Sequence, residues 1–306
     1  MAGKRGISVN DLFGGRFISP EAARRSMAAL EKQLDADFAA RTRLRKQLTA
    51  SPEKISAPFL DASEKGAAAS AARELRRLHH VARGLKVQRP RIVKVNGGIF
   101  TGLSGATVAP PFDYQWSWSA VSGDDPGDNS VSADRASGDL SLILDTGIDD
   151  SSSSAARAAV GIYFYPPLSN GTLQVWSAPW FSYLWGTFCS FASAHADGWI
   201  GMYVGSYDLS GKFTGAVIDS RVSLWSHDQW FGSTTNSDFS SGYGLYPPPV
   251  HVDRQHQYII WAWCGGEISA DGWHALWGSG ATDQFYVAVP SITWEFQPVW
   301  VVEAAP

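Results

Sequence analysis

Basic residues and tryptophans are divided between the two ends of this chain. Of the 25 Lys and Arg residues, 20 lie before residue 96, whereas all 14 Trp residues lie after residue 115. Residues 1–95 add nine acidic residues, for a net charge of +11, and residues 96–306 combine five basic with 20 acidic residues, for −15. The chain therefore has two chemically different parts, and their opposite charges predict contact between them, within one chain or between chains.

The basic part predicts an N-terminal arm over residues 1–18 and a helical hairpin over residues 19–95. Ser19-Pro20-Glu21 is typical of a helix start, because a side-chain acceptor precedes a proline and an acid that suit the first turn. We expect this helix to end at Ser51-Pro52, since proline lacks a backbone donor. Its apolar stripe consists of Met27, Leu30, Leu34, Phe38, Leu44 and Leu48.

A second helix is expected from Asp61, with Glu64 at the spacing of a capping box. Its apolar residues follow the a/d rhythm of a coiled coil, which predicts that the two helices pair antiparallel. Burial in such a hairpin is thin, so we also expect it to pack against the second part or another subunit. The seam consists of Ala68, Ala71, Leu75, Leu78, Ala82 and Leu85.

Arginines on the polar faces of these helices form a candidate assembly surface. They could contact an acidic protein surface, and a solvated helix face is the alternative. We do not expect nucleic acid as a partner, because no recognised binding motif is present and the overall charge is −4. The residues are Arg41, Arg45, Arg73, Arg76, Arg77 and Arg83.

Residues 96–306 predict an all-β domain, an antiparallel sandwich of the jelly-roll kind. Short runs of alternating apolar residues are separated by Gly, Pro, Asn and Asp, including Asp197-Gly198 and Asp208–Gly211. The run from Tyr258 to Cys264 is apolar on both faces, which is typical of a central strand whose outer side is covered. The hairpin, a long loop or another subunit could supply that cover.

Two cysteines, Cys189 and Cys264, cannot form a disulfide framework. Both lie in aromatic stretches, so we expect buried free thiols, with a bridge between sheets as the alternative. The first residues lack the apolar segment of a secretory signal, and no stretch approaches the roughly 18 apolar residues of a membrane span. We expect a cytoplasmic protein or one exported by a signal-independent route.

The tryptophans supply the main candidates for a ligand site. Trp in a loop beside Asp or His offers stacking together with directional hydrogen bonds, which suits a sugar. Burial in a core or in an oligomer interface is the alternative. The stacking and polar candidates are Trp180, Trp230, Trp273, Trp277, His227, Asp228 and His274.

Evidence for metal binding or catalysis is slight. Asp124, Asp125, Asp128 and Asn129 form an oxygen-rich loop that could hold calcium, but its spacing differs from that of the EF-hand. We expect no cofactor otherwise. No nucleophile elbow, phosphate loop or zinc-protease motif is present, and Glu295 is the carboxylate that an enzyme acting on polysaccharides would use.

Three functional hypotheses remain. The first is a non-enzymatic surface-recognition protein with a β-sandwich head that binds a glycan and forms a homo-oligomer. The second is a self-assembling structural protein, a subunit of a ring, filament or phage-like particle, held together by contacts of basic helices with acidic sandwiches. The third is a polysaccharide-active enzyme.

Overall fold

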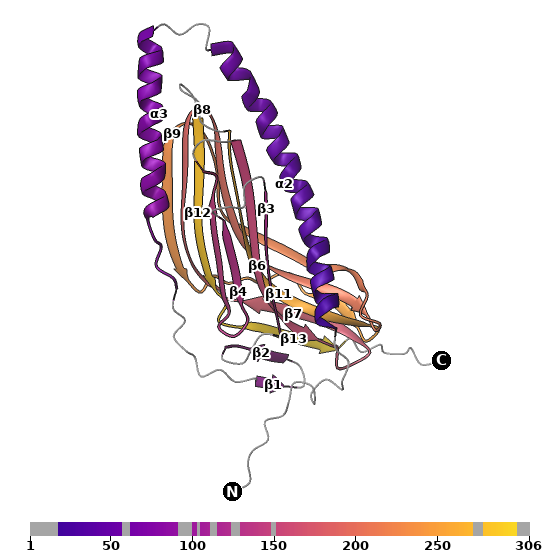
Figure 1. Ribbon diagram of the computed structural model, residues 1–306. Coiled ribbons are helices and arrows are strands. Elements are labelled where there is room, and N and C mark those ends of the chain that lie inside the picture. The colour runs from indigo at the N-terminus through magenta and orange to yellow at the C-terminus, as the bar shows by residue number, and fades with distance from the viewer. Residues whose placement is uncertain are drawn as a thin grey trace, which may run out of the picture.

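The computed structural model describes residues 18–56, 62–90, 100–102, 105–110, 115–123, 129–147, 151–271 and 278–298. Two helices precede a large antiparallel β-structure (Figure 1). In chain order the elements are α2 (Pro20–Ser56), α3 (Ala62–Gly84), β1 (Phe100–Gly102), β2 (Gly105–Val108), β3 (Trp116–Gly123), β4 (Ser130–Asp134), β5 (Asp139–Asp145), β6 (Ser151–Phe164), β7 (Asn170–Ser177), β8 (Trp180–Asp208), β9 (Phe213–Ser241), β10 (Val250–Asp253), β11 (His256–Asp271), β12 (Gly278–Ala288) and β13 (Ile292–Pro298).

The main sheet has the order β3-β6-β11-β8-β12-β5-β4, with β9 paired to β8. β8 pairs with β11 along Ala194–Asp208 and with β12 along Trp180–Ser190. β11 and β12 therefore follow each other along one side of β8, and β9 follows the other side throughout. The register shifts between Ser190 and Ala194, and we call this level of the sheet the apex.

The sheet folds over at the apex, so that its two halves form the two layers of a sandwich. Tyr183 and Trp225 demonstrate the fold, because their ring centroids are 4.3 Å apart. Tyr183 is paired with Asp238 of β9, 13 positions beyond Trp225 on the same strand. In a flat sheet this separation would be roughly 40 Å. The two layers must therefore face each other across the interior.

The interior is apolar and is closed at the end away from the apex by a second sheet. Leu142 and Leu144 of one layer and Val160 and Ile162 of the other belong to the same buried cluster. The second sheet, β1-β2-β13-β7-β10, adds further residues to this cluster, and the ring of Phe164 lies 4.8 Å from that of Trp294. The expected β-sandwich with an N-terminal helical segment is confirmed.

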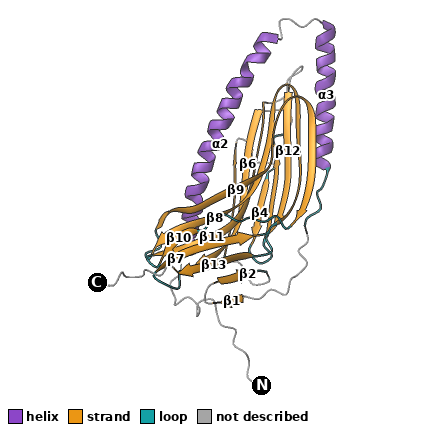
Figure 2. Cartoon of the chain, turned by 180° about the vertical axis from the view of Figure 1, so that it is seen from behind, coloured by secondary structure: helices purple, strands orange, loops and turns teal. Residues whose placement is uncertain are grey.

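The two helices lie on opposite outer faces of the sandwich (Figures 1 and 2). Met27, Leu30 and Leu34 of α2 are buried against aromatic residues of β8 and β11, including Trp261 and Trp263. On the other face, Ala72, Leu75 and Ala82 of α3 pack against Phe188. The predicted contact between the two parts is thus made within one chain, and α2 alone supplies the cover expected over β11.

The helices differ from prediction in two respects. Leu75 and Ala82 of the expected coiled-coil seam face the sheet, so the stripe packs on strands instead of on the other helix. α2 also continues through Ser51-Pro52 to Ser56, because one missing donor removes a single backbone hydrogen bond. The predicted start is confirmed, since Ser19 Oγ accepts a hydrogen bond from Ala22 N at 3.1 Å. Asp61 lies outside the described residues.

Strands β8 and β9, of 29 residues each, are far longer than the short runs predicted. The expected turn at Asp197-Gly198 lies inside β8. Gly198 serves packing there: a Cβ atom at this position would lie 2.1 Å from the ring of Trp225, its cross-strand partner. The expected turn at Asp208–Gly211 is real and joins β8 to β9.

Candidate functional site

Exposed aromatic side chains concentrate in one short stretch of the chain. Among the described residues, the aromatic side chains with large exposed surfaces are Trp230, Phe231, Phe239, Tyr243 and Tyr246, and they are 38–67% exposed. The first three belong to β9, and the other two follow it. Most other aromatic rings are in the interior or beneath α2. Within the described residues, this stretch is therefore the largest part of the aromatic surface that a ligand could reach.

The half of β9 after the apex presents aromatic and hydroxyl side chains to solvent. Alternate residues of a strand share one face, and here each of them is exposed. Ser182 and Trp180 of β8 lie on the same face, because they pair with Phe239 and Ser241. We call the outward residues of this stretch the Ser/Thr face; they are Phe231, Ser233, Thr235, Ser237, Phe239 and Ser241.

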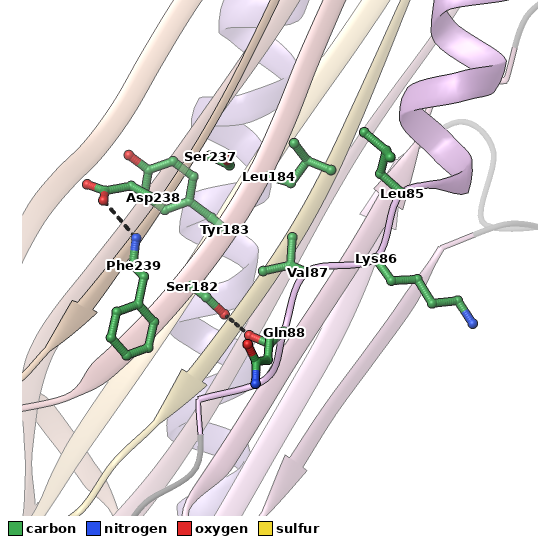
Figure 3. A pocket seen from close by; sticks show the side chains of 10 residues that line it. All are labelled: Leu85, Lys86, Val87, Gln88, Ser182, Tyr183, Leu184, Ser237, Asp238 and Phe239. Carbon is green, nitrogen blue, oxygen red and sulfur yellow. Dashed lines mark hydrogen bonds between the residues drawn. The ribbon is translucent and has the colours of Figure 1, made fainter.

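A groove lies where the chain leaving α3 crosses β8 beside this face (Figure 3). Its volume is about 590 Å³. Leu184 and Val87 supply apolar surface, while hydroxyl and amide groups supply hydrogen-bonding capacity. The lining residues are Leu85, Lys86, Val87, Gln88, Ser182, Tyr183, Leu184, Ser237, Asp238 and Phe239.

Hydrogen bonds to β12 and β8 fix the segment that forms one wall of the groove. Gln284 donates through Nε2 to Leu85 O at 2.5 Å and accepts from Val87 N at 3.4 Å. Ser182 Oγ donates to Gln88 O at 2.8 Å (Figure 3). The guanidinium of Arg89 lies 4.9 Å from the ring centre of Tyr286. Both walls are therefore held by the sheet, which favours a preformed site.

The charges of the groove balance. Lys86 and Asp238 are its ionisable residues of opposite sign. Asp238 accepts a hydrogen bond from Phe239 N at 2.7 Å. Burial, with a smaller contribution from Asp238, raises the pKa of Tyr183, so this phenol keeps its proton at neutral pH. An uncharged polar ligand matches such a lining better than an ion does.

Of the predicted stacking residues, Trp180 and Trp230 are on strands instead of loops. Trp180 is half-buried at the start of β8 and lies on the face of the groove. Trp230 is 50% exposed at the apex. His227 points toward Trp185, with ring centroids 5.1 Å apart, and is held by Gln229. Trp180 pairs with Ser241, 11 positions beyond Trp230 on β9, so the two tryptophans are far apart along the sheet.

Asp228 is engaged by another side chain and does not pair with Trp230 to form a ligand site. His195 on β8 bonds through Nδ1 to Asp228 at 2.8 Å and through Nε2 to Asp197 at 3.2 Å. Trp273, His274 and Trp277 lie outside the described residues. Asp271 and Gly278, which flank that segment, contact the apex, because Asp271 accepts from Ser193 and Gly278 pairs with Ser190.

A charged cluster lies beneath α2, next to the apolar contact of that helix. Arg157 and Glu267 are buried, with side-chain exposures of 0% and 1%. Arg157 donates to Asp35 at 2.7 Å, and Arg41 donates to Glu267 at 2.5 Å. The pKa of Glu267 is raised, chiefly by burial and also by Asp197, while the two arginines act in the opposite direction. α2 covers the cluster, so it serves helix docking.

Several residues of the expected assembly surface therefore have partners within the chain. Arg41 binds Glu267, Arg83 lies 3.3 Å from Asp145, and Arg77 binds Glu74 of its own helix. Arg73 is exposed and Arg76 is half-buried on α3. The side chain of Arg45 lies outside the described residues.

The other sequence candidates can be placed briefly. Cys189 and Cys264 are buried free thiols, as predicted. Asn129 binds Ser154 and Asp145, whereas Asp124, Asp125 and Asp128 lie outside the described residues. The part of the chain that is described holds no cluster of three or more metal-ligating side chains. Glu295 is exposed on β13. None of the helices that the structure describes is long and apolar enough to cross a membrane.

Sequence reasoning did not assign Phe239, Ser182 or the segment from Leu85 to Gln88 to a ligand site, and it placed Leu85 in the helical seam. The available signal was the alternation of Phe231, Ser233, Thr235, Ser237 and Phe239, which is a strand pattern with hydroxyls where a core would need apolar side chains. The crossing of the segment after α3 could not be read from sequence, because it depends on where α3 docks.

Comparison with known proteins assigns no family. No protein-family model matches the sequence, and no curated protein matches it. Solved structures with some likeness include TmCBM61 in complex with β-1,4-galactotriose, at 12% identity over 58% of this chain and 90% of that one, with a TM-score of 0.21.

Two further structures are similar to a comparable extent. The C-terminal family 22 carbohydrate-binding module of Clostridium thermocellum Xyn10B is 14% identical over 59% of this chain and 88% of that one, with a TM-score of 0.17. A CocE/NonD family hydrolase from Staphylococcus aureus is 9% identical over 56% of this chain and 37% of that one, with a TM-score of 0.20. At these TM-scores the likeness assigns neither a family nor a function to this chain.

Proposed function

We propose that this protein is a non-enzymatic surface-recognition protein whose β-sandwich binds a neutral glycan in the groove beside β9. The observation that carries the proposal is the placement of Trp180 and Phe239 around Ser182 on one face, next to the groove. Aromatic rings can stack on the apolar face of a sugar, and the neighbouring hydroxyl and amide groups can bond its hydroxyls.

Three features of the groove support this ligand class. The lining combines apolar and hydrogen-bonding groups without a net charge. Its floor and walls belong to β8, β9 and a segment bonded to β12, so little ordering is needed on binding. The Ser/Thr face also adjoins the groove through Ser237 and Phe239 and adds exposed hydroxyls along β9.

The test is binding to an array of neutral oligosaccharides, followed by calorimetry with the best ligand. Phe239→Ala and Trp180→Ala should each weaken binding about tenfold, equivalent to about 1.4 kcal/mol. Tyr246→Ala is the matched control, because this tyrosine is 67% exposed and does not line the groove. Loss of binding in Trp230→Ala but not in Phe239→Ala would move the site to the apex, and no binding by the parent protein would refute the proposal.

A further inference from the structure

The outer edge of β9 has no strand partner in the part of the chain that the structure describes. Ser237 N and Phe239 N donate to the side chains of the residues before them, at 2.9 and 2.7 Å, and an added strand would displace these two bonds. β9 pairs with β8, and no other described strand pairs with it. Such an edge presents a row of backbone donors and acceptors that can pair with another strand. Natural edges of this length usually carry lysine, proline or bulges that prevent pairing. From Gly232 to Ser241 the register with β8 is regular, and Asp238 is the one charged residue.

From Phe231 to Phe239 the Ser/Thr face reads the same in both directions about Thr235. Its order is Phe231, Ser233, Thr235, Ser237 and Phe239. An antiparallel pairing of this segment with its own copy, centred on Thr235, places Phe231 opposite Phe239 and Ser233 opposite Ser237. On the other face, Gly232 comes opposite Asp238 and Thr234 opposite Asn236. The facing pairs on one face are then two aromatic residues or two hydroxyl residues. On the other face Asp238 meets an uncharged glycine, so no like charges meet.

We infer that two copies of this chain pair edge to edge through β9, with a two-fold axis at Thr235. A two-fold interface uses the same patch on both subunits, which requires a self-complementary sequence of this kind. Pairing with an unrelated strand would not require a symmetric order of side chains. The pattern therefore favours a second copy of this chain as the partner. The pairing uses backbone groups at the edge and does not depend on the glycan proposal.

Cysteine cross-linking tests both the partner and the register. Opposite residues in an antiparallel pair have Cα atoms about 4.5–5.5 Å apart, within the range of about 4.4–6.8 Å that a disulfide allows. Thr235→Cys should therefore cross-link with the partner's copy of the same residue under mild oxidation and double the mass on a non-reducing gel. The two copies of Ser233→Cys would be offset by about 13 Å along the strands and should not cross-link.

The native cysteines do not interfere, because Cys189 and Cys264 are both 0% exposed. Thr235→Lys should convert the dimer to monomer in sedimentation or light scattering, since it places two ammonium groups across the axis. Ala216→Lys is its control, at an exposed position of the other half of β9. A native protein that stays monomeric at high concentration, or Ser233→Cys cross-linking as well as Thr235→Cys, would overturn the inference. Circular dichroism of each variant confirms that the monomer remains folded.

Discussion

The guanidinium of Arg157, on β6, donates to the carboxylate of Asp35, on α2, across 2.7 Å. The arginine is fully buried, whereas the aspartate is 37% exposed, so the bond joins the sheet to the edge of its helical cover. The same guanidinium lies 3.5 Å from Glu267, which in turn accepts from Arg41. One buried arginine therefore connects α2 to two strands of the sandwich.

Removal of this arginine should be costly. Arg157→Ala leaves Glu267 buried with one cationic partner fewer and should lower the free energy of unfolding by about 3–5 kcal/mol. Arg25→Ala is the matched control: its ion pair with Glu21 is largely exposed and should contribute less than about 1 kcal/mol. Chemical denaturation of both variants makes the comparison. Equal effects would show that the buried cluster does not hold α2.

Asp283 predicts a distinct dependence of stability on pH. Its side chain is 0% exposed in the interior, and neither carboxylate oxygen has a hydrogen-bonding partner among the described residues. Burial, reinforced by Asp197, raises its pKa well above the ordinary value. The folded state then keeps the proton after the unfolded state has lost it, so this residue lowers stability by about 1.4 kcal/mol per pH unit above about pH 4, until its own pKa is reached.

The variant that tests this effect is Asp283→Asn, which cannot ionise. Its melting temperature should exceed that of the parent by a margin that widens as the pH rises from 4. The exposed Asp37, changed to Asn, should give a difference that stays nearly constant. A flat profile for Asp283→Asn would mean that the carboxylate is ionised at no cost and that the interior reaches water.

His79 predicts that the docking of α3 becomes stronger as the pH rises, the opposite of the pH dependence expected from Asp283. It is buried against Phe188, with ring centroids 5.3 Å apart, and its pKa is lowered chiefly by burial. Asp145, at 3.7 Å, favours the charged form, whereas His80 and Arg83 oppose it. A histidine with a depressed pKa supports docking fully above its ordinary pKa of about 6.5, and this support is lost as the pH falls below that value.

Hydrogen exchange can follow this effect in α3 alone. Between pH 7.5 and pH 5, backbone amides of α3 should lose protection in the parent, after correction for intrinsic rates. His79→Gln should show a smaller loss, and His80→Gln, at an exposed position, should behave like the parent. If the parent and His79→Gln lose protection equally, the docking of α3 does not sense this histidine.

Glycines beneath tryptophan rings should resist substitution. Trp261 lies over its cross-strand partner Gly161, where an added Cβ atom would be 2.6 Å from the ring. Gly161→Ala should therefore destabilise the protein by about 1–3 kcal/mol. Gly66 on α3 has open space around it, and Gly66→Ala should stabilise the helix by up to about 1 kcal/mol. Thermal unfolding of both variants distinguishes the two outcomes.

The fold class could be predicted because short runs of period-two alternation recur along residues 96–306. Leu140, Leu142 and Leu144 point into the interior as their spacing indicates. The charge partition likewise predicted contact between the helices and the sandwich. The burial of other tryptophans has a local reason: Trp199 and Trp263 each lie opposite a glycine, Gly265 and Gly201, so their rings fill space within the sheet surface.

The rest depends on relations between distant residues. The sequence Asp197-Gly198 is typical of a turn. Its place inside a strand becomes clear only because the ring of Trp225 occupies the space above the glycine. The ion pair of Arg157 with Glu267 could not be predicted, because 110 positions separate the two residues in the sequence. The groove forms where the segment after α3 crosses β8, and this crossing follows from the docking of α3 against Phe188.

The packing of α2 and α3 on opposite faces of the sandwich has a consequence for biosynthesis. These helices leave the ribosome before the strands that they contact, and Arg41 can bind Glu267 only after a further 226 residues have been made. Until then Met27, Leu30 and Leu34 have no sheet to cover them. The nascent chain therefore carries an uncovered apolar stripe until these strands have been made, and docking of the helices has to follow closure of the sandwich. Contacts this distant in sequence also favour slow folding.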